Sequence, residues 1–466
     1  MTFRKINKIH FVGIGGIGMS GIAELLKNLG FSVTGSDITK SRNVERLTNL
    51  GINIKIGHKP ENLGSADVLV YSSAVSIENP EIIRARQIEI PIIKRAEMLG
   101  ELITFKKTSI AVGGTHGKTS TSSMVGSVLA EGKFDPTMVI GGMVKNLNTN
   151  SKLGSGETIV VEADEFDKSF LSLKPTIGLI TNIELEHVDC YENLKDYQNA
   201  FLDFCKSIPF YGECILCIDS PGVKDIVSKI ERPMTTYGRS RDAVYRAKNL
   251  RFNENKTTYS VFRAEENLGD IELNVPGEHN VLNSLAAVVI GVEMGLSFSI
   301  IKKGLKKYNG VRRRFEIKKT NDNFMVVDDY AHHPSEIEAT LTAAKNGWDK
   351  RIIAVFQPHL YSRTKAFYRE FANALSNADF IIITEIYPAR EEKIPGITSA
   401  LIYDQCIKIG LTECKYIKDL DDLANVLDKI VKPNDMVLTM GAGSIWRYSD
   451  LYAKHLLSNN LGGNID

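Results

Sequence analysis

Short apolar segments alternate with longer amphipathic segments along most of the chain. The apolar segments have the length and the Val and Ile content of buried strands, whereas stretches such as residues 18–29 have the length and spacing of helices. Parallel strands need crossover connections, which are usually helices, so this alternation is typical of parallel sheets covered by helices. The pattern predicts an α/β fold.

The predicted strands form three series. They are residues 8–12, 32–35, 68–71 and 90–94 in the first series, residues 108–112, 158–161 and 176–181 in the second, and residues 324–328, 351–356, 380–384 and 436–440 in the third. Because each series has its own helices, we expect three α/β domains. The polar segment 104–108 and the basic segment 310–314 mark the breaks, which gives domains at 1–106, 107–311 and 312–466.

Composition and charge narrow the classes of function. The 466 residues are 43% hydrophobic and 24% charged, close to the average for globular proteins, so disorder is excluded as the main state. Lys and Arg number 57 against 56 Asp and Glu, and the net charge of +1 offers no global field for nucleic acid or an anionic membrane. No apolar run approaches the ~20 residues that span a bilayer. We expect neither a nucleic-acid partner nor a membrane partner.

Six cysteines are too few for a disulfide framework in a chain of this length. Cys214 and Cys217 form a C-x-x-C pair, but they lie in an apolar, strand-like segment, and no second Cys pair or His cluster supplies metal ligands. We interpret them as buried strand cysteines. Sparse, unpaired cysteines favour a reducing, cytoplasmic location.

A complete G-x-G-x-x-G motif at residues 13–18 follows the first predicted strand and opens the first predicted helix. Its glycines allow a tight turn and let backbone N–H groups approach a pyrophosphate at the helix N-terminus. Asp37 lies 19 residues beyond Gly18, at the end of the second strand, where an acidic residue would bind a ribose hydroxyl. On these residues alone an NAD site is the natural interpretation, and another diphosphate ligand or a purely structural turn are the alternatives.

Residues 113–120, Gly-Gly-Thr-His-Gly-Lys-Thr-Ser, lie between a predicted strand and a predicted helix. The segment resembles a P-loop, in which backbone amides would cradle phosphates, Lys118 would reach the β and γ phosphates, and the Thr119 hydroxyl would hold Mg²⁺. Val112 stands where the strict motif has its first glycine. The segment predicts a nucleoside triphosphate site, which a dehydrogenase does not need.

A phosphate loop needs acidic partners for its metal ion, and these partners should end neighbouring strands. Glu162 ends a predicted strand and begins the segment 162–167, which contains four acids. His187 follows another predicted strand and could ligate a second metal ion. The alternatives are a solvated acidic loop for the segment and a structural role for the histidine.

Polar residues in the later part of the chain are further candidates. Asn280 and Asn283 are three apart, so a helix would place them on one face, as nucleotide contacts or as caps. The three arginines at 312–314 suit phosphate oxygens or a charged linker. The segments 328–334 and 357–363 contain histidines and follow strands of the third series, on the ligand side of an open α/β sheet.

These motifs, in this order, resemble the Mur ligase family of peptidoglycan synthesis. The resemblance rests on Gly-Ile-Gly-Gly-Ile-Gly-Met-Ser at 13–20, Gly-Thr-His-Gly-Lys-Thr-Ser at 114–120 and Asp-Asp-Tyr-Ala-His-His-Pro at 328–334, and it spans nearly the whole chain. It implies an N-terminal Rossmann-like domain for a UDP-sugar and a central P-loop-type ATPase domain with a mostly parallel sheet. The third implied domain is a C-terminal Rossmann-like α/β domain that contacts the amino acid and the nucleotide.

Within the family, residues 13–20 are most similar to the branch that adds L-alanine. The resemblance implies that L-alanine is joined to the lactyl carboxylate of UDP-N-acetylmuramate through an acyl phosphate, with ATP and Mg²⁺ required. The first glycine loop would then bind the diphosphate of the UDP-sugar, which replaces the NAD interpretation.

The resemblance also implies roles for individual residues. The UDP-sugar would be bound by Gly15, Gly16, Ile17, Gly18, Asp37, Ser72 and Ser73. ATP would be bound by Gly114, Thr115, His116, Gly117, Lys118, Thr119, Ser120, Asn280 and Asn283. One Mg²⁺ would be held by Thr119 and Glu162, and a second by His187. The catalytic set would be Lys118, Glu162, His187, Arg314 and Asp329, and the amino acid would be bound by His332 and Arg363.

Three positions depart from the pattern of other family members. Phe201 stands where several members have a carbamylated lysine near the second metal ion, so no carbamate is expected here. This departure fits the alanine-adding branch. Leu360 replaces an arginine that lies beside the substrate in some members, and Ser444 replaces an acid that commonly follows Gly-Ala-Gly.

Three alternative functions stay open at this point. The nearest is the recycling ligase that attaches an intact tripeptide to the same UDP-sugar, and the others are an NAD-dependent oxidoreductase and a non-catalytic nucleotide sensor. The P-loop and Glu162 argue against an oxidoreductase, and Lys118 and His187 argue against a sensor. We expect small-molecule substrates, a cytoplasmic location, and a monomer or a weak homodimer.

Overall fold

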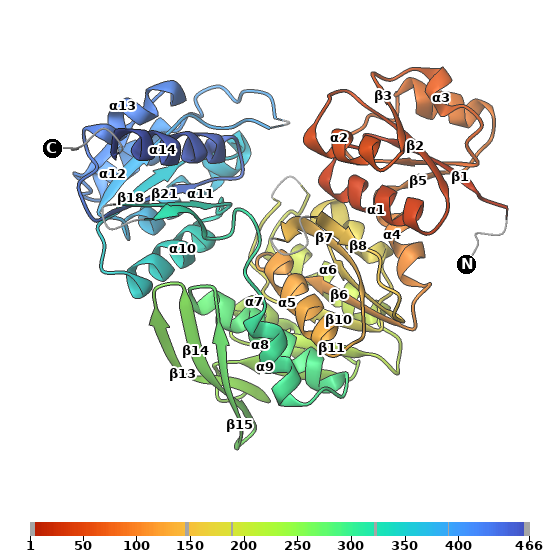
Figure 1. The fold of residues 1–466 in the computed structure, drawn as a ribbon, viewed down its shortest axis with the longest axis horizontal. Helices are drawn as coiled ribbons and strands as arrows, with labels where there is room; N and C mark the ends of the chain where they lie inside the picture. Colours follow the sequence, from red (N-terminus) through yellow and green to blue (C-terminus); the bar gives the residue numbers. More distant parts are fainter. Residues whose placement is uncertain (1–4, 145–148, 188–189, 321–323, 390, 461–466) are drawn as a thin grey trace. The chain divides into compact units, whose positions relative to one another are not determined.

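The computed structural model describes residues 5–144, 149–187, 190–320, 324–389 and 391–460 (Figure 1). The chain forms two compact units. Unit 1 contains Met1–Lys248, Val261–Gly269 and Leu282–Tyr308, and unit 2 contains Asn249–Ser260, Asp270–Val281 and Asn309–Asp466. The strands of the three predicted series lie in three separate sheets.

The N-terminal sheet of unit 1 is parallel and has the strand order β3-β2-β1-β4-β5. Its strands are β1 (Lys8–Val12), β2 (Ser32–Asp37), β3 (Asn53–Ile56), β4 (Val68–Tyr71) and β5 (Ile92–Lys94). Its helices are α1 (Ile17–Asn28), α2 (Arg42–Asn49), η1 (Pro60–Leu63), α3 (Pro80–Gln87) and α4 (Arg95–Ile103). Ile9 and Phe11 of β1 belong to one apolar cluster and Val12 to another, because helices cover both faces of a parallel sheet.

The central sheet has ten strands in the order β15-β14-β13-β12-β11-β10-β6-β9-β7-β8. Its strands are β6 (Thr108–Gly113), β7 (Thr137–Val144), β8 (Thr149–Lys152), β9 (Thr158–Glu162), β10 (Ile177–Ile180), β11 (Glu213–Cys217), β12 (Met234–Gly238), β13 (Tyr245–Asn253), β14 (Lys256–Arg263) and β15 (Glu266–Leu273). Its helices are α5 (Lys118–Glu131), η2 (Phe166–Ser172), α6 (Leu194–Ser207), α7 (Pro221–Val227), α8 (Glu278–Glu293) and α9 (Phe298–Lys306).

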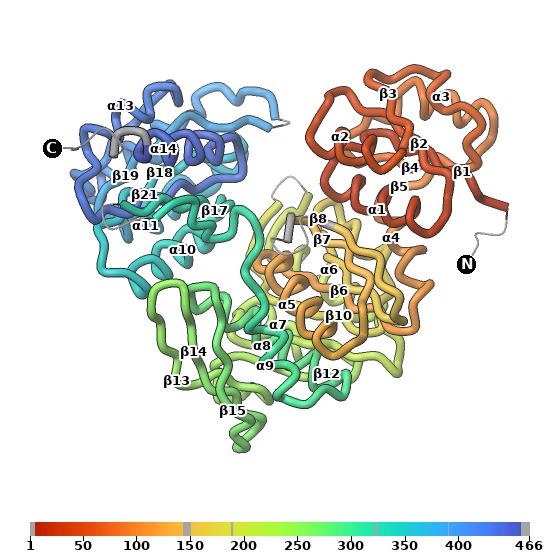
Figure 2. Tube along the Cα trace, viewed as in Figure 1, coloured from red at the N-terminus to blue at the C-terminus, as the bar shows by residue number. Residues whose placement is uncertain are grey.

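Strand β6 pairs in parallel with β10 on one side and with β9 on the other. The carboxyl ends of these three strands therefore lie next to one another, which is where open α/β sheets bind ligands. In the Cα trace the chain passes from β6 directly into α5, which lies beside α9 (Figure 2).

Unit 2 contains a six-stranded sheet in the order β16-β17-β21-β18-β19-β20. Its strands are β16 (Glu316–Thr320), β17 (Phe324–Asp329), β18 (Ile352–Phe356), β19 (Phe380–Ile383), β20 (Cys414–Tyr416) and β21 (Asp435–Met440). Its helices are α10 (Pro334–Gly347), α11 (Tyr361–Leu375), α12 (Ala400–Lys408), η3 (Leu420–Asp422), α13 (Leu423–Asp428) and α14 (Ile445–Asn460). The edge strand β16 is antiparallel to β17, and the other pairs are parallel.

The predicted α/β class and the mostly parallel sheets are confirmed, and each predicted strand matches an observed strand closely. The sequence-based series missed β3, an edge strand whose residues are mostly exposed, and also β7, β8, β12–β15, β16 and β20. β13 is buried only at its start and then alternates between partly buried and exposed positions, so it lacks the continuous apolar run of a central strand. Cys214 and Cys217 are free and buried in β11, as interpreted.

The predicted domain boundaries stay predictions. The segment 104–107 separates α4 from β6 within unit 1, and unit 2 takes up the chain from Asn309 onward. Of the helices that the structure describes, none has the length and apolar character needed to cross a bilayer.

A buried carboxylate connects the strands of the N-terminal sheet. Glu81 of α3 is 0% exposed. Its Oε2 lies 2.6 Å from Nε2 of His10 and accepts a hydrogen bond from the Ser36 hydroxyl at 2.9 Å, and its Oε1 lies 3.0 Å from both His58 Nδ1 and the Asn62 amide nitrogen. Burial by itself would raise the pKa of Glu81, but the hydrogen bonds from His10, Asn62 and Ser36 outweigh burial and lower this pKa.

We predict that Glu81→Gln destabilises the protein by about 3 kcal/mol at pH 7, because it leaves His10 buried without its charged partner. The measurement is the free energy of unfolding of unit 1, obtained from its unfolding transition in urea. Glu45→Gln is the matched control: Glu45 faces Lys40 at 3.9 Å with both side chains largely exposed, so its removal should cost less than about 0.5 kcal/mol.

The difference in stability between the native protein and Glu81→Gln should depend on pH. The pKa of Glu81 is lower in the folded protein than its ordinary value of 4.5, so the stabilisation is fully present above pH 4.5 and is lost as the pH falls through the folded-state pKa. The gap in stability between the two proteins should therefore narrow at acid pH. A gap that stays constant over this range would contradict the assignment of an ionised Glu81.

Candidate active site

The first glycine turn, residues 13–16, joins β1 to α1 and is held by β2. The backbone N–H groups of Gly13 and Ile14 donate to the Ser36 carbonyl at 2.9 and 3.0 Å, and the N–H of Gly15 donates to Oδ2 of Asp37 at 2.8 Å. A Cβ atom on Gly15 would lie only 2.8 Å from the same carboxylate oxygen, so this position requires glycine. The structure thus brings Asp37 to the turn, as predicted.

Asp37 is 9% exposed, and both of its carboxylate oxygens are used within the chain, since Oδ1 accepts from the Thr39 N–H at 3.1 Å. Its predicted contact with a ribose stays a prediction. Ser72, at the end of β4, lies beside the turn: its Cβ would be 3.3 Å from a Cβ on Gly13. Among the described residues no side chain caps the N-terminus of α1, which is the end of a helix that attracts anions.

The second glycine turn joins β6 to α5 and has little free space. Gly114 has φ +125° and Gly117 has φ +81°, in the region that favours glycine. A Cβ on Gly114 would collide with the hydroxyl of Thr181, and a Cβ on Gly117 would lie 2.5 Å from Oδ1 of Asn283. The turn is therefore packed closely between the end of β10 and helix α8.

Lys118, the first residue of α5, turns back into this loop. Its Nζ donates to the carbonyls of Gly114 at 2.6 Å and Thr115 at 2.9 Å, and it forms an ion pair with Glu165 at 2.9 Å. Burial by itself would lower the pKa of Lys118, but the charge of Glu165 outweighs it, and the pKa is raised. Lys118 is thus protonated at neutral pH and lies within the glycine turn.

Thr119 and Glu162 lie together, as predicted. Glu162 ends β9 next to the Thr119 side chain, and its Oε1 accepts from the N–H of Gly141 at 2.8 Å. Burial raises the pKa of Glu162. A hydroxyl and a carboxylate are hard oxygen donors of the kind that Mg²⁺ prefers, so this pair fits a magnesium ion.

His187 follows β10 and lies against an acid from the η2 segment. Its Nε2 is 3.4 Å from Oε1 of Glu165, and the ligand atoms of Glu165, Glu186 and His187 all lie within 4.8 Å of one another. Burial by itself would lower the pKa of His187, but the hydrogen bond with Glu165 outweighs it, and the pKa is raised. Glu165 and Glu186 are the neighbours that the structure provides for His187, and neither was in the predicted set.

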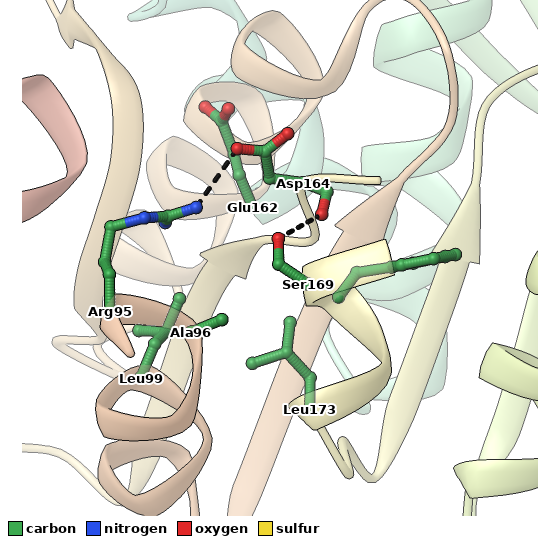
Figure 3. A pocket seen from close by; sticks show the side chains of 8 residues that line it. Arg95, Ala96, Leu99, Glu162, Asp164, Ser169 and Leu173 are labelled. Carbon is green, nitrogen blue, oxygen red and sulfur yellow. Dashed lines mark hydrogen bonds and ion pairs between the residues drawn. The ribbon is translucent and has the colours of Figure 1, made fainter. Parts of the chain in front are cut away.

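Arg95, the first residue of α4, points toward Asp164 of the acidic segment (Figure 3). Its guanidinium lies 3.1 Å from Oδ2 of Asp164, and it would be 3.2 Å from a Cβ on Gly18. Arg95 and Asp164 border one small pocket. Its lining residues are Arg95, Ala96, Leu99, Glu162, Asp164, Ser169, Phe170 and Leu173. Arg95 belongs to no sequence motif, and only the packing of α4 on η2 reveals it.

Helix α8 carries both predicted asparagines. Asn283 accepts a hydrogen bond from the Thr121 hydroxyl at 3.1 Å and faces Gly117, so it lies against the phosphate loop within unit 1. Asn280 lies in unit 2, where its side-chain amide donates to the Pro276 carbonyl at 2.7 Å. Of the two asparagines, the structure places Asn283 at the loop.

In unit 2, Asp329 ends β17 and binds the backbone on both sides. Its carboxylate accepts from the N–H of Phe315 at 2.7 Å and of Ala331 at 2.8 Å. Burial raises the pKa of Asp329 to about 6, against the opposing charge of Arg314. Arg314 in turn lies 3.3 Å from Glu336 and over the ring of Tyr330. Asp329 therefore anchors the segment that leads into the C-terminal sheet.

The two predicted amino-acid contacts lie on neighbouring loops of unit 2. The rings of His332 and His359 are 6.0 Å apart, and the guanidinium of Arg363 lies 3.1 Å from Nδ1 of His359. Arg363 is only 6% exposed, on the first turn of α11. His359 thus links His332 to Arg363.

The three departures from the family pattern each have a defined place. Phe201 is fully buried, and its ring packs against Phe170 at 5.1 Å and Tyr197 at 5.3 Å. Leu360 precedes α11 with φ +71°, a strained conformation for leucine, and donates its N–H to the Tyr387 carbonyl at 3.0 Å. Ser444 accepts from the Gln357 amide at 3.3 Å.

Family models match three consecutive parts of the chain. The "Mur ligase family, catalytic domain" model matches residues 8–107, the "Mur ligase middle domain" model residues 112–291, and the "Mur ligase, glutamate ligase domain" model residues 313–443. Together they span most of the sequence.

Known proteins are similar over nearly the full length. UDP-N-acetylmuramate–L-alanine ligase of Syntrophus aciditrophicus (strain SB) is 50% identical over 442 residues, which are 95% of this chain and 92% of that protein. The crystal structure of UDP-N-acetylmuramate–alanine ligase MurC from Thermotoga maritima is 31% identical, with a TM-score of 0.83 over 97% of this chain and 99% of that chain. A murein peptide ligase from Psychrobacter arcticus 273-4 shares the fold at 24% identity, with a TM-score of 0.69 over 98% and 99% of the two chains. On the family models and this identity, the chain belongs to the Mur ligase family.

Proposed function

We propose that this chain is an ATP-dependent ligase that joins L-alanine to the lactyl carboxylate of UDP-N-acetylmuramate, in the synthesis of peptidoglycan precursors. The observation that carries the proposal is the 50% identity, over 95% of the chain, to a UDP-N-acetylmuramate–L-alanine ligase. The tripeptide-adding alternative has weaker support, because the murein peptide ligase is similar at 24% identity and supports the fold alone.

The chemistry explains why such a reaction needs ATP. A carboxylate is a poor electrophile at neutral pH, so an amide forms only after the carboxylate gains a leaving group. Transfer of the γ-phosphoryl group of ATP to the lactyl carboxylate gives an acyl phosphate and ADP. The amine of L-alanine attacks the acyl carbon and loses a proton, and the tetrahedral intermediate then expels phosphate to leave the amide.

Lys118 is the residue that we assign to the transferred phosphoryl group. It is protonated and lies within the phosphate loop, so a change of side-chain rotamer would bring its charge to the β and γ phosphates. We assign Thr119 and Glu162 to Mg²⁺, on the basis of their oxygen donors and their proximity. When bound, Mg²⁺ neutralises charge on the transferring group. Asn283, which faces Gly117, would orient the nucleotide.

The first glycine turn is the site that we assign to the UDP-sugar diphosphate. Among the described residues no side chain caps the N-terminus of α1, and the guanidinium of Arg95 lies beside Gly18. Ser72 borders the same turn from the end of β4, and Ser73 follows it in the chain. A phosphate loop in the next domain has no purpose in an NAD-dependent oxidoreductase, which argues for a UDP-sugar here.

The acceptor amino acid is assigned to unit 2. Arg363 would pair with the carboxylate of L-alanine, and His332 would lie beside it through their common neighbour His359. Asp329 and Arg314 would support the loop that carries these residues. We retain domains at 1–106, 107–311 and 312–466, a cytoplasmic location, and a monomer or weak homodimer as parts of the proposal.

We predict that the purified chain releases phosphate from ATP in the presence of Mg²⁺, UDP-N-acetylmuramate and L-alanine, and that Lys118→Ala lowers kcat at least about 100-fold, because the charge on the transferred group is no longer neutralised. Lys107→Ala is the matched control, since Lys107 is 82% exposed and faces only Glu157 at 3.8 Å. Its rate should equal that of the native chain.

The acceptor dependence separates the alternatives in the same assay. Release with L-alanine and not with the tripeptide L-alanyl-γ-D-glutamyl-meso-diaminopimelate supports the proposal. Phosphate release with the tripeptide alone would identify the chain as a recycling ligase. No phosphate release with either acceptor would overturn the ligase assignment.

We predict that Arg363→Met raises the KM for L-alanine about 30-fold and changes the KM for UDP-N-acetylmuramate little, because a charge-assisted pair with the amino acid is worth about 2 kcal/mol. The measurement is initial-rate kinetics with each substrate varied in turn. Arg369→Met, an exposed arginine on the same helix, is the control and should behave as the native chain. Equal KM values for L-alanine in all three proteins would remove Arg363 from the amino-acid site.

A further inference from the structure

Glu165 is a carboxylate that an ammonium group and an imidazole approach at once. It is 0% exposed, and Nζ of Lys118 lies 2.9 Å from each of its oxygens. Its Oε1 is also 3.4 Å from Nε2 of His187. Oε2 is buried, and no residue in the described part of the chain donates a well-directed hydrogen bond to it, although Lys118 is close. Glu165 is therefore held mainly by charge.

The surroundings of Glu165 have the donor set of a divalent-cation site. Its carboxylate, the carboxylate of Glu186 and the imidazole of His187 bring their ligand atoms within 4.8 Å of one another. Carboxylates and imidazole are ligands for Mg²⁺ and Mn²⁺. The backbone here is strained, since His187 has φ +53°, and the Tyr191 hydroxyl donates to the Glu165 carbonyl at 2.6 Å. Such strain concentrates at functional sites.

A divalent cation would compete with Lys118 for Glu165. The ammonium of Lys118 would repel a cation bound to Glu186 and His187, and it already pairs with the carboxylate that such a cation would need. Binding of a nucleotide requires Lys118 to reach the β and γ phosphates. To do so it must leave Glu165, and a buried carboxylate without a partner is costly. A cation that enters at that moment restores the balance of charge.

We propose that Glu165 is exchanged between Lys118 and a divalent cation held with Glu186 and His187, so that this second cation site forms when the nucleotide draws Lys118 away. The inference rests on the proposed ATP-dependent function and deepens it. It assigns Glu165 a role as a positioning residue for Lys118 in the free chain and as a metal ligand in the nucleotide complex. The second cation would then have three protein ligands, Glu165, Glu186 and His187, whereas the sequence predicted His187 alone.

The test uses Mn²⁺ and the full chain without any nucleotide, and the readout is free Mn²⁺ measured by electron paramagnetic resonance. Lys118→Met frees Glu165, so this variant should bind Mn²⁺ at least about tenfold more tightly than the native chain, although it has lost a residue of the ATP site. Lys206→Met is the matched control, because Lys206 is 71% exposed and contacts Asp203. It should bind Mn²⁺ as the native chain does.

Two double variants identify the ligands. Lys118→Met combined with Glu165→Gln, and Lys118→Met combined with His187→Gln, should both lose the gain in Mn²⁺ affinity. Either an unchanged affinity in Lys118→Met or a gain that survives in both double variants would overturn the proposal. Because no ATP, UDP-sugar or amino acid is present, these outcomes are independent of the phosphate-release assay, which tests the ligase function itself.

Discussion

The charge of Lys118 is the constraint on which the central site depends. An ammonium buried beside a glycine turn needs compensation, and Glu165 supplies it from the η2 segment. The pair draws together the turn after β6 and the acidic segment after β9, and His187 after β10 joins it through the same carboxylate. Three strand ends are thus connected by one carboxylate, which explains why the loops converge here.

Buried carboxylates also connect neighbouring segments elsewhere in the molecule. In the N-terminal sheet, Glu81 connects β1 and β2 through His10 and Ser36, and in unit 2 Asp329 binds the backbone on both sides of its strand end. In each of the three sheets, a buried carboxylate fixes a strand end or a strand pair that lies near a candidate ligand loop. Hydrogen bonds and charge partners are what make such burial tolerable.

The residues that sequence reasoning identified are those whose function leaves a local pattern. The glycines at 13–18 and 113–120, Lys118 and Glu162 belong to segments with known spacing next to predicted strands. Glu165, Glu186 and Arg95 have no such pattern. The first two are ordinary acids in acidic stretches, and Arg95 is one basic residue at a helix start, so neither spacing nor composition separates them from solvated side chains.

The alternation of apolar and amphipathic segments determined the α/β class and the central parallel strands of each sheet, because burial on both faces demands continuous apolar residues. The glycine turns were also determined locally, since their φ angles and the lack of space for a Cβ at Gly15 and Gly117 leave few other residues. The tertiary structure alone decided the partners: that Glu165 faces Lys118, that Arg95 reaches Asp164, and that His359 links His332 to Arg363. Apart from His359 and Arg363, which are four residues apart, these pairs join residues from different segments, and their contacts exist only after strand order and helix packing bring the segments together.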